Sequence, residues 1–111
     1  MIRYIDVKNI AVIDSLQVEL GSGLNVVTGE TGAGKSVLIG AVGLLIGERA
    51  SPDLVRTGME DARVQAVFED GSGREYLVRR EIASQGRSRA FVDDVIVTTA
   101  ALRTLAGQLV D

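Results

Sequence analysis

The feature that most constrains the fold of this chain is a glycine-rich run between two apolar stretches. Residues 29–36 read Gly-Glu-Thr-Gly-Ala-Gly-Lys-Ser and match the pattern G-x-x-x-x-G-K-[ST] at every fixed position. Glycines let the backbone curl tightly and approach an anion closely. Successive backbone N–H groups then surround the anion, and the N-terminal end of a following helix adds positive potential. The run therefore predicts a phosphate-binding loop, with a strand before it and a helix after it.

Both flanks of the loop have the character that this prediction requires. Residues 24–28 form a short apolar, β-branched run, which predicts a buried strand. Residues 37–46 form an apolar stretch long enough for about three helical turns. Gly47 follows where the C-terminal end of a helix favours glycine. We therefore interpret the run as a phosphate-binding loop and not as a glycine-rich turn between two core elements.

Residue types within the loop predict ATP and Mg²⁺ as cofactors. Lys35 supplies a mobile positive charge for the β- and γ-phosphates, and the Ser36 hydroxyl is a hard oxygen ligand for Mg²⁺. Only Lys8 and Lys35 are lysines, so the match does not come from an abundance of lysine. The remaining positions supply loop geometry and backbone N–H groups. The predicted nucleotide-binding positions in this part of the chain are Gly29, Glu30, Thr31, Gly32, Ala33, Gly34, Lys35, Ser36 and Val37.

Length and composition exclude several other classes of protein. The chain has 111 residues, near the commonest size of a single domain but short for a complete P-loop ATPase, since only residues 37–111 follow the motif. It has no cysteine and no histidine, which removes disulfides, thiolate zinc sites and the usual catalytic base. The net charge of −3 gives no support for a strongly basic nucleic-acid surface. No stretch predicts a signal peptide or a membrane span, so we expect a cytoplasmic protein.

Alternating patterns elsewhere predict a sheet-rich fold. Residues 2–10 and 15–20 alternate polar and apolar side chains, which predicts an antiparallel pair ahead of the loop strand. Residues 61–97 predict hairpins or a β-meander, and Thr98 or Thr99 can cap a closing helix. The predicted fold class is α/β: a P-loop core fragment with an antiparallel β subdomain. Its predicted segments are residues 1–60 with the strands, loop and helix, residues 61–97 with the β-rich subdomain, and residues 98–111 with the closing helix.

Four arginines in the β-rich segment raise the question of a phosphate-binding surface. Acidic residues at 75, 81, 93 and 94 lie among them, which favours a solvated, charge-balanced hairpin over a basic patch. The four are Arg79, Arg80, Arg87 and Arg89.

The sequence resembles the amino-terminal part of the ATPase head of the RecN family, a bacterial DNA-repair branch of the SMC-like ABC ATPases. Strands ahead of the P-loop already favour an ABC-type order. The pair Glu30-Thr31 and the stretch Gly47-Glu48-Arg49-Ala50 are similar to RecN more than to other SMC-like proteins. The resemblance spans nearly the whole chain, through residues 9–14, 23–36, 44–51, 53–58, 86–92 and 105–110.

This resemblance implies an ATPase that acts in repair and recombination of DNA double-strand breaks, and that is located in the cytoplasm at the nucleoid. It implies that Lys35 is catalytic, that Lys8 and Asn9 lie near the base or ribose, and that Arg56 has a DNA-contacting or regulatory role. The signature motif and the Walker B acid of the family are missing here. The expected partners are therefore the C-terminal half of the same head, a second head in an ATP-dependent dimer, and DNA, with no membrane.

Two other functions stay open on the sequence alone. The chain can be the nucleotide-binding part of another ABC-type machine, such as a transporter subunit, or a non-catalytic module whose loop only holds an anion. Hydrolysis by these 111 residues alone is also open. For single residues, Lys8 and Asn9 can equally form a solvated strand end, and Arg56 can be an ordinary surface arginine.

Overall fold

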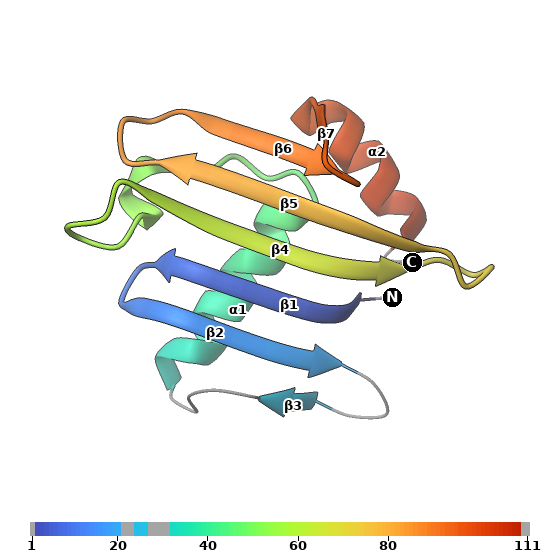
Figure 1. Ribbon diagram of the computed structural model, residues 1–111, viewed down its shortest axis with the longest axis horizontal. Helices are drawn as coiled ribbons and strands as arrows, with labels where there is room; N and C mark the ends of the chain where they lie inside the picture. The colour runs from blue at the N-terminus through green and yellow to red at the C-terminus, as the bar shows by residue number, and fades with distance from the viewer. Residues whose placement is uncertain (1, 21–23, 27–31, 110–111) are drawn as a thin grey trace.

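A computed structural model of the chain describes residues 2–20, 24–26 and 32–109. They form one antiparallel sheet with two α-helices on one of its faces (Figure 1). The strand order is β3-β2-β1-β4-β5-β6-β7. The elements are β1 (Ile2–Ile10), β2 (Ile13–Leu20), β3 (Leu24–Val26), α1 (Gly32–Leu45), the 3₁₀ helix η1 (Pro52–Leu54), β4 (Asp61–Glu69), β5 (Glu75–Ala83), β6 (Ser88–Val92), β7 (Val95–Val97) and α2 (Thr99–Leu109).

The predicted strands are confirmed, and they join into a single sheet. The pair β1 and β2 precedes the loop, and β4 to β7 form the predicted meander. Because β4 pairs directly with β1, the meander continues the sheet that contains the strands ahead of the loop. The strand before the loop is β3, at the edge beside β2. Residues 21–23 and 27–28 of the predicted turn and strand lie outside the described residues.

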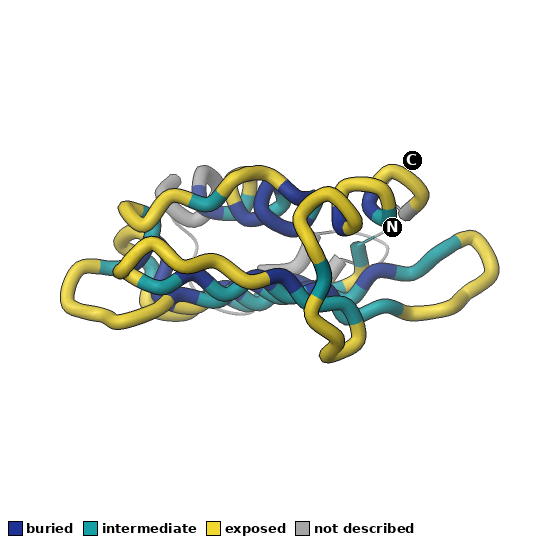
Figure 2. Tube along the Cα trace, turned by 90° about the horizontal axis from the view of Figure 1, so that it is seen from above, coloured by how far each residue is buried: buried dark blue, intermediate teal, exposed yellow. Residues whose placement is uncertain are grey.

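Period-two alternation separates the two faces of the sheet. One row of neighbouring residues on the inner face consists of Leu16, Val7 and Val64, all buried. Helix α1 covers this face over β1, β2, β4 and β5, while α2 packs on β6. Seen from above in Figure 2, the helices form one layer and the sheet forms the other. The core therefore lies between the two layers, and within the described part of the chain no helix covers the opposite face of the sheet.

Helix α1 is apolar around much of its circumference. Ala41, Leu44 and Leu45 are buried against the sheet, whereas the side chain of Ile39 is 77% exposed. A helix with apolar side chains on several faces is typical of one that is covered on both sides in a larger protein. Among the described residues, no helix combines the length and the apolar character that crossing a bilayer requires.

The start of α2 confirms the predicted helix cap. The Thr98 hydroxyl accepts a hydrogen bond from the Ala101 backbone N–H at 3.0 Å. Such a bond satisfies one of the N–H groups that the first turn leaves unpaired. Leu102 and Ala106 are buried beneath the helix, so α2 is fixed to the sheet by apolar packing.

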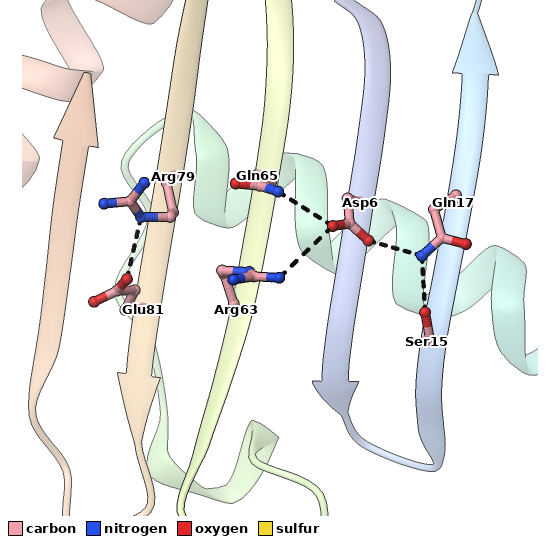
Figure 3. A network of polar contacts seen from close by, with 7 residues as sticks. All are labelled: Asp6, Ser15, Gln17, Arg63, Gln65, Arg79 and Glu81. Atoms are coloured by element: carbon pink, nitrogen blue, oxygen red, sulfur yellow. Dashed lines mark hydrogen bonds and ion pairs between the residues drawn. The ribbon is translucent and has the colours of Figure 1, made fainter. Parts of the chain in front are cut away.

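The open face of the sheet carries a polar network centred on Asp6 (Figure 3). Its two carboxylate oxygens accept hydrogen bonds from Gln17 on β2 at 3.0 Å and from Gln65 on β4 at 3.2 Å. Farther along this face, Arg79 pairs with Glu81 at 3.1 Å and with Asp94 at 2.8 Å. The charge-balanced interpretation of the hairpin therefore describes Arg79 well.

Arg80 does not belong to a solvated hairpin surface or to a basic patch. Its side chain points to the inner face and is only 1% exposed. It lies between Val78 and Ile82 on β5, both buried, so the strand's alternation places it in the core layer. The sequence-based grouping of Arg80 with Arg79, Arg87 and Arg89 is wrong for this reason.

Hydrogen bonds in the β4–β5 turn shift the pKa of the Asp70 carboxyl group, which can be measured. The hydroxyl and backbone N–H of Ser72 donate to Asp70, as do the backbone N–H of Arg74 and the hydroxyl of Tyr76. These bonds, led by the Ser72 hydroxyl, lower the pKa of Asp70 below 3.8. Because the folded-state pKa is depressed, its stabilising effect is present above the unfolded pKa and is lost as pH falls through the folded value. We expect Ser72→Ala to raise the NMR titration midpoint of Asp70, whereas Ser84→Ala leaves it unchanged.

Candidate functional site

Helix α1 begins inside the glycine-rich motif. Its first residue is Gly32, so the backbones of residues 32–35 form the first turn and Ser36 follows directly. Backbone N–H groups of a first turn have no partner within the helix, and together they form an anion-binding end. Val37 follows and is buried against the sheet, which fixes the start of the helix. Gly29, Glu30 and Thr31, and the side chains of residues 32–36, lie outside the described residues.

The segment after α1 is joined to the end of β1 by backbone hydrogen bonds. The N–H of Ala11 donates to the carbonyl of Leu54 at 2.7 Å, and the N–H of Arg56 donates to the carbonyl of Asn9 at 2.8 Å. Between them, Ile10 and Val55 form a β-bridge. The fold thus brings Arg56 beside Asn9, although the two are far apart in sequence.

Asn9 presents a buried acceptor that has no hydrogen-bond partner among the described residues. Its residue is 8% exposed, and its side-chain N–H donates weakly to the Asp61 carbonyl at 3.4 Å, while Oδ1 makes no hydrogen bond. An unsatisfied buried acceptor costs about 1–3 kcal/mol. The backbone of Asn9 also has a positive φ of 58°, which few side chains tolerate and asparagine accepts. Both features suit a residue whose amide oxygen accepts a hydrogen bond from a ligand.

A cavity of about 790 Å³ opens beside Asn9 at one end of the open face. The strand register explains its charged lining, because Lys8 pairs with Arg63, Arg63 with Glu81, and Glu81 with Arg89. Side chains from four adjacent strands therefore meet at one place. Among the lining residues are Lys8, Asn9, Arg63, Glu81, Arg87 and Arg89.

Among the residues that the structure describes, Arg56 has one ionic partner, and the pair is weak. Its guanidinium lies 3.8 Å from the carboxylate of Asp14, and both side chains are substantially exposed. Exposed ion pairs of this kind contribute about 0–1 kcal/mol, so Asp14 holds the arginine loosely. Arg56 is therefore placed beside the Asn9 backbone with a guanidinium that a stronger anion can attract.

The structure thus gathers Lys8, Asn9 and Arg56 around the end of β1. Arg63 lines the cavity together with Lys8 and Asn9, although no motif in the sequence singled it out. Strand alternation could have placed Arg63 on the open face of β4. Its position opposite Lys8 comes from the pairing of β4 with β1. Register between strands that are distant in sequence is not visible in a single sequence, which is why the pairing was missed.

Comparison with known proteins decides the family. The AAA domain family matches residues 4–107. The chain belongs to the AAA domain family. It is 40% identical over 124 residues to the DNA repair protein RecN of Vibrio cholerae, covering 98% of this chain and 22% of that protein. It is 37% identical over 127 residues to RecN of Bacillus subtilis, covering 100% of this chain and 22% of that protein. The resemblance to RecN is confirmed, and the AAA domain here spans about a fifth of the length of these curated relatives.

Solved structures confirm the fold class of this AAA domain. One, from a study of ATP-driven dimerization and DNA-stimulated activation of SMC ATPases, superposes with a TM-score of 0.79 at 20% identity. It covers 96% of this chain and 78% of that one. The SMC head domain from Thermotoga maritima superposes with a TM-score of 0.74 at 21% identity, covering 94% of this chain and 41% of that one. The antiparallel sheet with its helices is therefore the fold of an SMC-like head lobe.

Proposed function

We propose that this chain binds Mg·ATP as the first half of an ATPase head of the RecN kind. The observation that carries the proposal is the position of the motif: it leads directly into α1, which begins toward the end of the sheet where β1 ends (Figure 1). The buried Oδ1 of Asn9, for which the described residues offer no hydrogen-bond partner, and Arg56 lie around that same strand end. The helix terminus suits the phosphates of a nucleotide, and the buried acceptor suits a donor on its base or ribose.

Each predicted residue has a distinct task in this proposal. Backbone N–H groups of residues 29–34 bind the phosphates, and Lys35 neutralises their charge. The Ser36 hydroxyl is suited to Mg²⁺, which would balance the remaining negative charge of the phosphates. The Oδ1 of Asn9 accepts a hydrogen bond from the base or ribose, and Lys8 lies beside it. Arg56 adds a positive charge that contacts nucleotide or DNA.

Hydrolysis and repair belong to the full-length protein in this proposal. The exposed apolar side of α1, marked by Ile39, supports packing against the C-terminal half of the same head. That half would supply the group that orients water. A second head then completes the site in an ATP-dependent dimer, and the cytoplasmic protein acts on DNA at the nucleoid during double-strand-break repair. RecN relatives at 33–40% identity favour this role over a transporter subunit or a bare anion-binding module.

Asn9→Gly in the full-length gene product tests the proposal at a described residue. Glycine keeps the positive φ and removes the amide, so the fold is retained while one ligand contact is lost. We expect ATP affinity, measured by calorimetry, to fall about tenfold, the effect of losing about 1.4 kcal/mol.

The matched control is Asp94→Gly, which removes another side chain from a residue of positive φ, in the exposed β6–β7 turn. We expect it to bind ATP like the wild type. No ATP binding by the wild type would refute the proposed function. If Asn9→Gly binds ATP with the affinity of the wild type, Asn9 does not contact the nucleotide.

A further inference from the structure

Two arginines hold the C-terminal end of α1 from different elements. Arg80 on β5 donates to the carbonyls of Leu44 at 2.9 Å and Glu48 at 2.8 Å. Its other terminal nitrogen donates to the hydroxyl of Ser88 on β6 at 2.8 Å. Carbonyls at the end of a helix carry partial negative charge and lack partners within the helix, so a guanidinium complements them. The end of α1 is thereby anchored to the sheet.

Arg103 makes the second attachment, from α2. Its guanidinium donates to the carbonyl of Gly47 at 3.2 Å, immediately after α1 ends. Gly47 has a φ of +101°, and a Cβ placed on it would lie 2.3 Å from Cγ of Arg103 and 3.0 Å from the Thr99 carbonyl oxygen. The start of α2 therefore lies directly against Gly47, two residues after α1 ends, at a distance that only glycine permits.

Helix α1 joins this junction to the predicted phosphate-binding loop. It has 14 residues, and at about 1.5 Å per residue such a helix behaves as a rod of about 21 Å. Its N-terminal end carries the motif, and its C-terminal end is held by Arg80 and Arg103. A restraint placed on one end of a regular helix reaches the other through its hydrogen-bonded backbone.

We propose that Arg103 is a positioning residue that couples α1 to α2, so that nucleotide bound at the start of α1 also restrains α2. The coupling rests on the proposed function, since it requires nucleotide at that end of the helix. Arg80 fixes the end of α1 on the sheet. Arg103 transmits the restraint of α1 to α2. The apolar contacts of Leu102 and Ala106 hold α2 on the sheet, whereas Arg103 links it to the end of α1.

Hydrogen exchange of the full-length gene product measures this coupling directly. Amide exchange in α1 and α2 is followed by mass spectrometry with and without Mg²⁺ and a non-hydrolysable ATP analogue. In the wild type we expect nucleotide to slow exchange in both helices. In Arg103→Ala we expect slowing in α1 to persist and the slowing in α2 to fall by about threefold or more. Arg103→Lys, which keeps a donor for the Gly47 carbonyl, should restore part of the effect.

The matched control is Arg74→Ala, which removes an exposed arginine of the β4–β5 turn that pairs with Asp93. It should leave the response of both helices unchanged. If nucleotide slows exchange in α1 and equally in α2 of Arg103→Ala, the coupling is refuted while ATP binding stands. The coupling is also refuted if, in the wild type, nucleotide slows amide exchange in α1 but leaves exchange in α2 unchanged. If α1 of the wild type does not respond, ATP binding at this site is refuted, and the coupling with it.

Discussion

Lys35→Ala is expected to abolish nucleotide-dependent activity of the full-length protein. Phosphoryl transfer depends mainly on positioning and on neutralising charge around the phosphates, and Lys35 is the cation that the motif provides. The negative charge of the phosphates would then be balanced by Mg²⁺ and backbone N–H groups alone. We expect the rate of ATP hydrolysis to fall by at least about a hundredfold, the scale of losing one electrostatic contact in an active site. Phosphate release under saturating ATP measures this rate.

Two further variants make this experiment specific. Lys35→Arg retains the charge, but the planar guanidinium has a different shape from the compact ammonium group, so we expect most activity to be lost. Arg74→Ala removes one positive charge far from the motif and should hydrolyse ATP at the wild-type rate. Wild-type hydrolysis by Lys35→Ala would show that the motif does not form the site, and would favour a different phosphate-binding region.

Arg80→Met should cause a large loss of stability, because Arg80 is a fully buried side chain with three hydrogen bonds. Methionine fills much of the volume but removes the donor of the Glu48 carbonyl and of the Ser88 hydroxyl, and leaves the Leu44 carbonyl with the Gly47 N–H alone. We expect the free energy of unfolding to fall by about 2–4 kcal/mol, since a hydrogen bond to a charged group contributes about 1.5–3 kcal/mol and removal of a buried charge offsets part of the loss. Chemical denaturation of the chain, followed by circular dichroism, measures the difference.

The neighbouring residue supplies the control. Arg79→Met alters the same strand on the open face, where the arginine pairs with Glu81 and Asp94 and lies over the ring of Phe91. We expect a loss of about 1 kcal/mol or less there. Burial lowers the pKa of Arg80, but its ordinary value is so far above neutrality that the side chain stays charged. Equal stability of the two variants would show that the contacts of Arg80 with α1 contribute little.

Much of the fold could be predicted from local patterns. Alternation of polar and apolar residues gave β1, β2 and the meander, because one face of each strand is buried and the other is not. The cap at Thr98 was predictable because hydroxyl oxygens satisfy first-turn N–H groups. The glycine-rich motif predicted a helix after it, although the helix begins earlier than residue 37, at Gly32.

For Arg80, the alternation of the strand and the charge of the side chain point to opposite faces of the sheet. It alternates with Val78 and Ile82, which are buried, so periodicity placed it on the inner face. The acidic residues among the arginines nevertheless favoured a solvated hairpin, and arginine is in general rarely fully buried. Arg80 departs from the rule because carbonyls at the end of α1, distant in sequence, accept from one terminal nitrogen, and the Ser88 hydroxyl accepts from the other.

By itself, the sequence determined the P-loop prediction, the strands and helices around it, and the resemblance to RecN. These depend on residue type at fixed spacing, and that information is local. Only the tertiary structure decided that Asn9 and Arg56 meet at the end of β1, that Arg63 and Arg89 line the same cavity as Lys8, and that Arg80 and Arg103 fasten α1. Such neighbours are set by strand register and by the packing of helices on the sheet, which depend on the whole chain at once.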